Sequence, residues 1–134
     1  MPARGNGRDR APAAPLLFAY GTLMSGYSRH RFLTRRATAL GEAFVKGQLL
    51  DLGSYPGLVA GAGRVRGELY RLDDVDLLPV LDEEEGVYNF ERRRTTVTPA
   101  RGRGRRAWVY WYRGPRVHAV PIPHGDYRRA HPRP

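Results

Sequence analysis

LLFAYGTLMSGYSRH, residues 16–30, begins with five apolar residues that predict a buried strand, and the strand then stops at a Gly-Thr pair. Gly21 follows Tyr20 directly, without a spacer of loop length. Two explanations are open at this point. The glycine is a plain bend at the end of the strand, or it lets the backbone approach a ligand that a side chain would crowd.

The overall composition predicts one domain without disulfides. The chain has 134 residues, enough for a single hydrophobic core, and it has no cysteine, which excludes disulfides, a thiol nucleophile and thiolate metal sites. Its four histidines are scattered without ligand spacing, so we expect no metal site and no cofactor. No apolar run approaches the roughly 20 residues of a membrane span, and the N-terminus lacks the apolar segment of a secretory signal. We therefore expect a cytoplasmic protein without a membrane partner.

The formal net charge of +10 raises the alternative of an arginine-rich nucleic-acid-binding protein. All of the 23 basic residues except Lys46 are arginines, and the densest cluster is RGRGRR, residues 101–106, in a predicted hairpin loop. A solvated loop and a bias in composition account for this pattern. No motif of a known nucleic-acid-binding fold accompanies it, so nucleic acid is not the expected partner.

Short strands separated by Gly and Pro dominate the chain. Residues 1–15 are predicted to be a disordered N-terminal tail, residues 16–128 a single domain, and residues 129–134 a flexible C-terminal tail. Strands are expected at 41–53, 63–72, 90–99 and 106–114, the last two forming a hairpin. Gly47 is read as a bulge, Pro56-Gly57 as a type II turn, and Ser28 as the N-cap of a short helical turn. The pattern favours a barrel or a strongly coiled sheet with one or two short helices.

One clear helix is predicted in DDVDLLPVLDEEEG, residues 73–86. Pro79 would break a helix that began at Asp73, but it fits the first turn if Asp76 is the N-cap. Gly86 is the expected stop signal at the C-terminal end.

The acidic run of this helix contains the candidate for acid–base chemistry. When the helix is projected at 100° per residue, Glu84 and Glu85 fall near the edge of the apolar face, whereas Asp82 and Glu83 point away and are expected to be solvated. Burial at such an edge raises the pKa of a carboxyl group and suits it to proton transfer near neutral pH. Periodicity alone leaves both Glu84 and Glu85 open.

Four motifs in order resemble one known family. They are FAYGTLMSG (18–26), GELYRL (67–72), LDEEEGVYNFERR (81–93) and IPHGDY (122–127). Together they are similar to the γ-glutamylcyclotransferase-like (AIG2-like) superfamily over residues 16–128, and most of all to its small bacterial members and the γ-glutamylamine cyclotransferases. The resemblance implies an α+β fold, a compact mixed β-barrel with a cavity at one end.

The resemblance also implies a site and an activity. It assigns the role of catalytic general acid and base to Glu85, and it assigns substrate binding to Tyr20, Gly21, Thr22 and Leu23, whose backbone N–H groups would contact the γ-glutamyl group. It thereby favours ligand approach as the reason for Gly21. The implied reaction cleaves a small-molecule γ-glutamyl amine or peptide into 5-oxoproline and a free amine, without cofactor or metal.

The chain departs from the family pattern at one aromatic position. Phe90 stands two residues before Arg92, where members often have Tyr, although Tyr88 lies close by. Tyr55, Tyr88 and Tyr127 are candidates for the rim that meets the amine. A non-catalytic small-molecule-binding protein on the same fold is the other alternative function, and an intact Glu85 argues against it. The sequence predicts neither the amine nor the oligomeric state.

Overall fold

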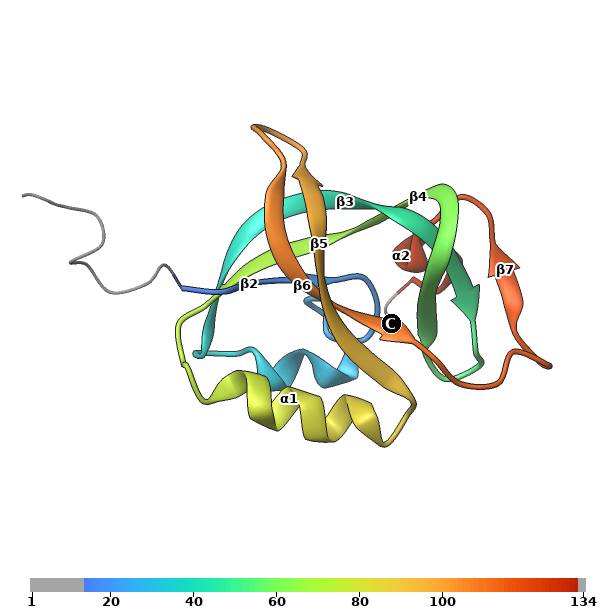
Figure 1. Ribbon diagram of the computed structural model, residues 1–134, viewed down its shortest axis with the longest axis horizontal. Coiled ribbons are helices and arrows are strands. Elements are labelled where there is room, and N and C mark those ends of the chain that lie inside the picture. The colour runs from blue at the N-terminus through green and yellow to red at the C-terminus, as the bar shows by residue number, and fades with distance from the viewer. Residues whose placement is uncertain (1–13, 133–134) are drawn as a thin grey trace, which may run out of the picture.

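Five strands pair into a closed ring in the computed structural model, which describes residues 14–132 (Figure 1). The ring runs β2, β4, β3, β5, β6 and back to β2. The pairing of β6 with β2 is parallel, and the other four pairings of the ring are antiparallel. This arrangement confirms the predicted mixed β-barrel. The bounds of the five strands are β2 Leu16–Ala19, β3 Ala37–Asp51, β4 Pro56–Leu72, β5 Phe90–Pro99 and β6 Arg105–Tyr112.

Short elements complete the barrel. Strand β7 (Val120–Ile122) pairs with the end of β3, and the 3-10 helix η2 (Ser28–Phe32) lies between β2 and β3. Helix α1 (Leu77–Gly86) lies across one side of the barrel, opposite the projecting loop of the β5–β6 hairpin, and helix α2 (Tyr127–Ala130) lies near β7 (Figure 1). No helix in the described part of the chain is long and apolar enough to cross a membrane.

The predicted domain boundaries fall mainly at the ends of the described chain. Residues 1–13, most of the predicted N-terminal tail, and residues 133–134, the end of the predicted C-terminal tail, lie outside the described residues. Pro15 already belongs to the fold, since its carbonyl accepts a hydrogen bond of 2.9 Å from the Leu72 N–H. At the other end, α2 continues past residue 128, and His131 contacts Asp51.

The β3–β4 hairpin confirms one predicted feature and corrects another. The register shifts between Lys46 and Gln48, so the bulge at Gly47 is confirmed. The type II turn at Pro56-Gly57 is wrong, because Pro56 begins β4 and pairs with Asp51. Proline is tolerated at the first residue of a strand, and the chain reverses just before it.

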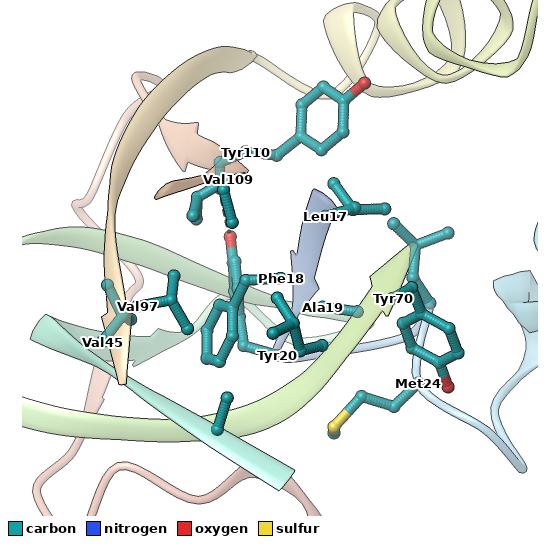
Figure 2. Close-up of a cluster of buried hydrophobic side chains, with 14 of the residues drawn as sticks. Leu17, Phe18, Ala19, Tyr20, Met24, Val45, Tyr70, Val97, Val109 and Tyr110 are labelled. Carbon is teal, nitrogen blue, oxygen red and sulfur yellow. Dashed lines mark hydrogen bonds between the residues drawn. The ribbon is translucent and has the colours of Figure 1, made fainter. Parts of the chain in front are cut away.

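The core fills the barrel around β2, whose four residues are all buried. Figure 2 shows Phe18 among the side chains of the surrounding strands, and Tyr20 close to the strand that carries Tyr110. Tyr70 of β4 is also buried and only 3% exposed. Its hydroxyl donates a 2.6 Å hydrogen bond to Glu68, which provides the partner that a buried phenol needs.

Helix α1 has the predicted bounds, but its two ends work differently from the prediction. Asp76 occupies the N-cap position, yet its side chain makes no capping hydrogen bond. Gly86 is the last helical residue, and the left-handed residue that follows the helix is Asn89, with φ of 70°. Ser28 likewise begins η2, but the N-cap position belongs to Tyr27.

Gly67 tests how closely β2 and β4 must approach. A Cβ at Gly67 would collide with the Ala19 carbonyl oxygen and lie 2.7 Å from the Phe18 ring. We expect Gly67→Ala to lower the free energy of unfolding, measured by urea denaturation, by about 1–3 kcal/mol, because overpacking of a core costs about this much. Gly86→Ala is the matched control, because a Cβ there meets nothing within 4 Å and alanine favours a helix. Equal stability of the two variants would contradict the close approach.

Candidate active site

The end of β2, the start of β4 and helix α1 surround a cleft, here called the inner cleft, with about 370 Å³ of empty space that is partly continuous with solvent. Its lining combines apolar and aromatic side chains with two charged groups. The lining residues are Phe18, Ala19, Tyr20, Gly21, Thr22, Leu23, Arg29, Tyr55, Pro56, Glu85, Phe90 and Tyr110. All five residues that the family resemblance assigned to the site therefore line one cleft.

Glu85 is the buried carboxylate of this cleft. It is 7% exposed and shares the inward face of α1 with Leu77 and Leu81. Glu84, which periodicity could not separate from it, has a side chain that is 45% exposed. The structure thus distinguishes the two glutamates by burial, although the catalytic role of Glu85 stays a prediction.

Arg29 lies directly beside Glu85. Its Nη2 atom is 2.8 Å from Glu85 Oε2 and 3.8 Å from Glu84 Oε1. The geometry of the shorter contact is not that of a hydrogen bond, so the buried Oε2 atom accepts none from the described residues. Glu85 Oε2 is therefore buried without a hydrogen bond, and the positive charge of Arg29 lies beside it.

The pKa of Glu85 reflects opposing effects. Burial raises it above the ordinary glutamate value, the positive charge of Arg29 lowers it, and the negative charge of Glu84 raises it further. Burial is the largest of these effects, so the pKa is raised overall. A buried carboxyl group with a raised pKa beside a cation is typical of an acid–base site.

Asp82 fixes helix α1 to the barrel. It was expected to be solvated, and its side chain is indeed 40% exposed, but the carboxylate is also bonded to the barrel, which the sequence did not predict. Its carboxylate accepts hydrogen bonds of 2.8 and 3.0 Å from Arg92 of β5, and one of 2.8 Å from the Tyr110 hydroxyl of β6. Figure 2 shows the Tyr110 side chain reaching toward the helix. Because Glu85 follows Asp82 by less than one turn, this contact sets the rotation of α1 that directs Glu85 inward.

Tyr20 contributes its ring to the inner cleft and uses its hydroxyl elsewhere. The hydroxyl donates to the Tyr110 carbonyl at 2.7 Å and accepts from the Leu58 N–H at 3.1 Å. Burial raises its pKa strongly, so the phenol stays neutral. The predicted contribution of Tyr20 to substrate binding therefore falls to its ring or its backbone.

The structure gives a packing reason for the glycine at position 21, in addition to the ligand approach that the resemblance implies. A Cβ at Gly21 would lie 2.6 Å from Pro56 Cγ. The missing side chain makes room for the buried proline at the start of β4. Substitution of Gly21 would therefore disturb packing as well as any ligand.

The backbone of the loop from Gly21 to Leu23 still offers free donors. Its carbonyl groups accept from Met24 N–H, Arg29 N–H and His30 Nδ1. No described residue accepts a hydrogen bond from the three N–H groups of the loop. Unpaired backbone N–H groups beside a cleft are suited to bind an anionic or carbonyl oxygen.

The far side of this loop is held by an ion pair, which we call the Ser25 clamp. The Ser25 N–H donates to Glu68 at 2.9 Å, and the Ser25 carbonyl accepts from Arg128 at 2.7 Å. Arg128 and Glu68 also bond to each other at 2.6 Å. The C-terminal segment thus positions the loop that lines the cleft.

The remaining aromatic candidates separate. Tyr55 and Phe90 line the inner cleft, and Tyr88 packs edge-on against Tyr55 with ring centroids 5.3 Å apart. Tyr127 is not part of the cleft lining and packs against Tyr27. Within residues 14–132, no three metal-binding side chains gather where they could hold an ion.

The sequence analysis missed Arg29 and the Ser25 clamp. Arg29 stands in a polar, basic stretch that carries no periodic signal, and its partner on α1 is distant in sequence. A paired cation for a core-edge glutamate could have been anticipated on physical grounds, but its position could not.

Comparison with known proteins agrees with the fold and the four motifs. Residues 17–129 match the sequence profile of the family described as gamma-glutamyl cyclotransferase, AIG2-like. A Vibrio cholerae protein named after gamma-glutamylcyclotransferase is 41% identical over 115 residues, which cover 84% of this chain and 94% of the relative. The gamma-L-glutamyl-butirosin B gamma-glutamyl cyclotransferase of Niallia circulans is 31% identical over 106 residues, which cover 73% of this chain and 67% of that protein. The crystal structure of an AIG2-like protein from Mus musculus has the same fold, with a TM-score of 0.74 at 23% identity over 90% of this chain and 92% of its own.

Arg29 should hold the pKa of Glu85 below the value that burial alone would give. We expect Arg29→Met to raise the pKa of Glu85, measured by NMR titration of carbon-labelled carboxyl groups. Arg103→Met, which removes the same charge from the exposed hairpin loop, should leave the titration of Glu85 close to that of the wild type. An unchanged Glu85 pKa in Arg29→Met would show that the ion pair does not control ionisation.

The Ser25 clamp should make stability depend on pH. Hydrogen bonds from Tyr70, Ser25 and Arg128 outweigh burial and hold the pKa of Glu68 below its ordinary value of 4.5. A depressed pKa stabilises the folded state above the unfolded-state pKa, and this contribution is lost as pH falls through the folded-state pKa. Urea denaturation should therefore show Glu68→Gln to be less stable than the wild type at neutral pH. The difference in the free energy of unfolding should shrink below about pH 4.5. Glu83→Gln, at an exposed residue, is the control, and a margin for Glu68→Gln that does not vary with pH would contradict the clamp.

Proposed function

The chain belongs to the gamma-glutamyl cyclotransferase, AIG2-like family, and we propose that it is an enzyme that cleaves a γ-glutamyl amine or γ-glutamyl peptide into 5-oxoproline and a free amine. The observation that carries this proposal is Glu85. Its carboxylate is buried at the inner cleft without a hydrogen bond to Oε2, and the same cleft is lined by a loop whose N–H groups have no acceptor among the described residues. A buried carboxylate costs folding free energy, so its presence favours a chemical role.

The first step uses Glu85 as a base. The α-amino group of a γ-glutamyl amide is protonated at neutral pH, and the Glu85 carboxylate accepts one of its protons. The freed nitrogen then attacks the γ-carbonyl carbon of the same glutamyl group and closes a five-membered ring. The electron pair of the carbonyl double bond moves to oxygen and gives a tetrahedral oxyanion. In this proposal the free N–H groups of Gly21 to Leu23 stabilise that charge, as fixed donors do in other acyl-transfer sites.

The second step uses the same carboxyl group as an acid. Protonated Glu85 donates its proton to the amide nitrogen of the leaving group while the attacking nitrogen gives up its extra proton to the carboxylate. The oxyanion electron pair reforms the carbonyl, the bond from the γ-carbon to the amide nitrogen breaks, and the amine departs. The amine then takes the remaining proton, so no water or cofactor is consumed.

Arg29 assists by balancing the burial of Glu85. Without this cation the pKa of Glu85 would be raised further by burial, which disfavours the ionised form that accepts a proton. The inner cleft supplies the other requirement. Its aromatic walls would hold the glutamyl chain folded so that its amino group faces its own carbonyl, which converts the attack into a well-oriented intramolecular step.

The alternative functions gain less support. A binding protein without catalysis has no need of a buried, incompletely hydrogen-bonded carboxylate. The arginines that a nucleic-acid interface would require are partly engaged, since Arg36, Arg92 and Arg128 pair with acidic side chains of the same chain.

The glutamate variants test the proposal. Glu85→Gln keeps the size of the side chain but cannot accept a proton, so kcat should fall by about 10²–10⁴, while Glu84→Gln should change it only a few-fold. The assay incubates each protein with a panel of γ-glutamyl compounds and measures 5-oxoproline by mass spectrometry.

Stability provides the control for this pair. Glu85→Gln should be at least as stable as the wild type at neutral pH, because a buried ionisable group with a raised pKa opposes folding once it is ionised. An active Glu85→Gln protein beside an inactive Glu84→Gln protein would move the catalytic role to Glu84. Full activity in both variants would remove the acid–base mechanism.

A further inference from the structure

A second cleft, here called the outer cleft, adjoins the inner one and has about 780 Å³ of empty space that includes open solvent. Three residues, Thr22, Arg29 and Tyr55, line both clefts. The other residues that line the outer cleft are Ser28, Arg31, Ser54, Glu84 and Tyr88. The two clefts therefore meet at Arg29.

The neighbouring glutamates of α1 face different clefts. Glu85 lines the inner cleft, and Glu84 lines the outer cleft. In a γ-glutamyl amide the nitrogen of the amine half is bonded to the γ-carbonyl carbon, so the amine half begins beside Glu85. An amine half at this point extends past the shared residues into the outer cleft, because the rest of the inner lining is mostly apolar or aromatic.

The charged groups of the outer cleft are not equivalent. Arg29 is shared between Glu85 at 2.8 Å and Glu84 at 3.8 Å, so Glu84 already has a cation nearby. Arg31 has no acidic partner among the described residues. The outer cleft thus contains one unpaired positive charge.

Arg31 is also held in place. Its Nη1 atom donates a 2.8 Å hydrogen bond to the Ser28 carbonyl, and its guanidinium lies 4.7 Å from the centre of the Phe32 ring. These contacts use one N–H group and one face of the guanidinium, which leaves the other donors available. A guanidinium that is already oriented loses less entropy when it binds a carboxylate.

We propose that the outer cleft binds the amine half of the substrate and selects, through Arg31, an amine half that carries a carboxylate. This inference rests on the proposed γ-glutamyl cyclotransferase function. A second positive charge on the amine half would instead meet two arginines, with only Glu84 to attract it. The substrate class is therefore a γ-glutamyl amino acid or peptide rather than a γ-glutamyl polyamine.

The experiment compares γ-glutamyl-L-alanine with γ-glutamylethylamide, which differ only by the carboxylate on the amine half. We expect the wild-type protein to prefer the alanine compound by about 10- to 100-fold in kcat/KM, mainly through KM, as hydrogen bonds to charged groups allow. Arg31→Gln should bring this ratio close to one. Arg103→Gln, which removes the same charge from the hairpin loop, should keep the wild-type ratio.

Binding separates this inference from the proposed function. In isothermal titration, the Glu85→Gln protein should bind γ-glutamyl-L-alanine more tightly than γ-glutamylethylamide. The double variant Arg31→Gln, Glu85→Gln should bind the two compounds equally. Absence of 5-oxoproline with every compound would overturn the catalytic proposal, whereas the titration would still report on Arg31. Equal use of the two compounds, a preference that survives Arg31→Gln, or a better reaction with γ-glutamylputrescine would overturn the inference.

Discussion

The hydroxyl of Tyr20 joins the strands between which β2 is inserted, and the position of the cleft depends on it. It bonds at once to the Tyr110 carbonyl of β6 and the Leu58 N–H of β4. A buried phenol without partners would destabilise the fold, whereas here both its donor and its acceptor are used. Because the loop that lines the cleft begins at the next residue, the contact that holds the barrel together also fixes where that loop starts.

Helix α1 is placed by a second internal contact, and Glu85 is carried with it. Leu77 and Leu81 would allow some rotation of the helix about its axis, since apolar packing has no direction. The three hydrogen bonds to Asp82 do have direction, and they join the helix to β5 and β6. The free energy gained from these bonds and from the buried leucines offsets the cost of moving the Glu85 carboxylate out of water.

Features that depend on neighbouring residues could be predicted from the sequence, and those that depend on distant contacts could not. The bounds of α1, the bulge at Gly47 and the mixed barrel followed from periodicity, glycine placement and the family resemblance. The choice between Glu84 and Glu85 needed the helix rotation that Arg92 imposes on Asp82. Pro56 was read as a turn because its dipeptide is typical of turns, and only its pairing with β3 places it in a strand.

Ion pairs of the described chain serve two different purposes around the cleft. The pairs Asp82–Arg92 and Glu68–Arg128 lie behind the helix and the loop, and each is well hydrogen-bonded, so each holds one element in place. The pair Arg29–Glu85 faces the cleft, is more buried, and leaves Glu85 Oε2 without a hydrogen bond. The described chain thus satisfies its supporting charges by hydrogen bonds but leaves a buried carboxylate oxygen at the cleft without one. Such local costs are expected at functional sites.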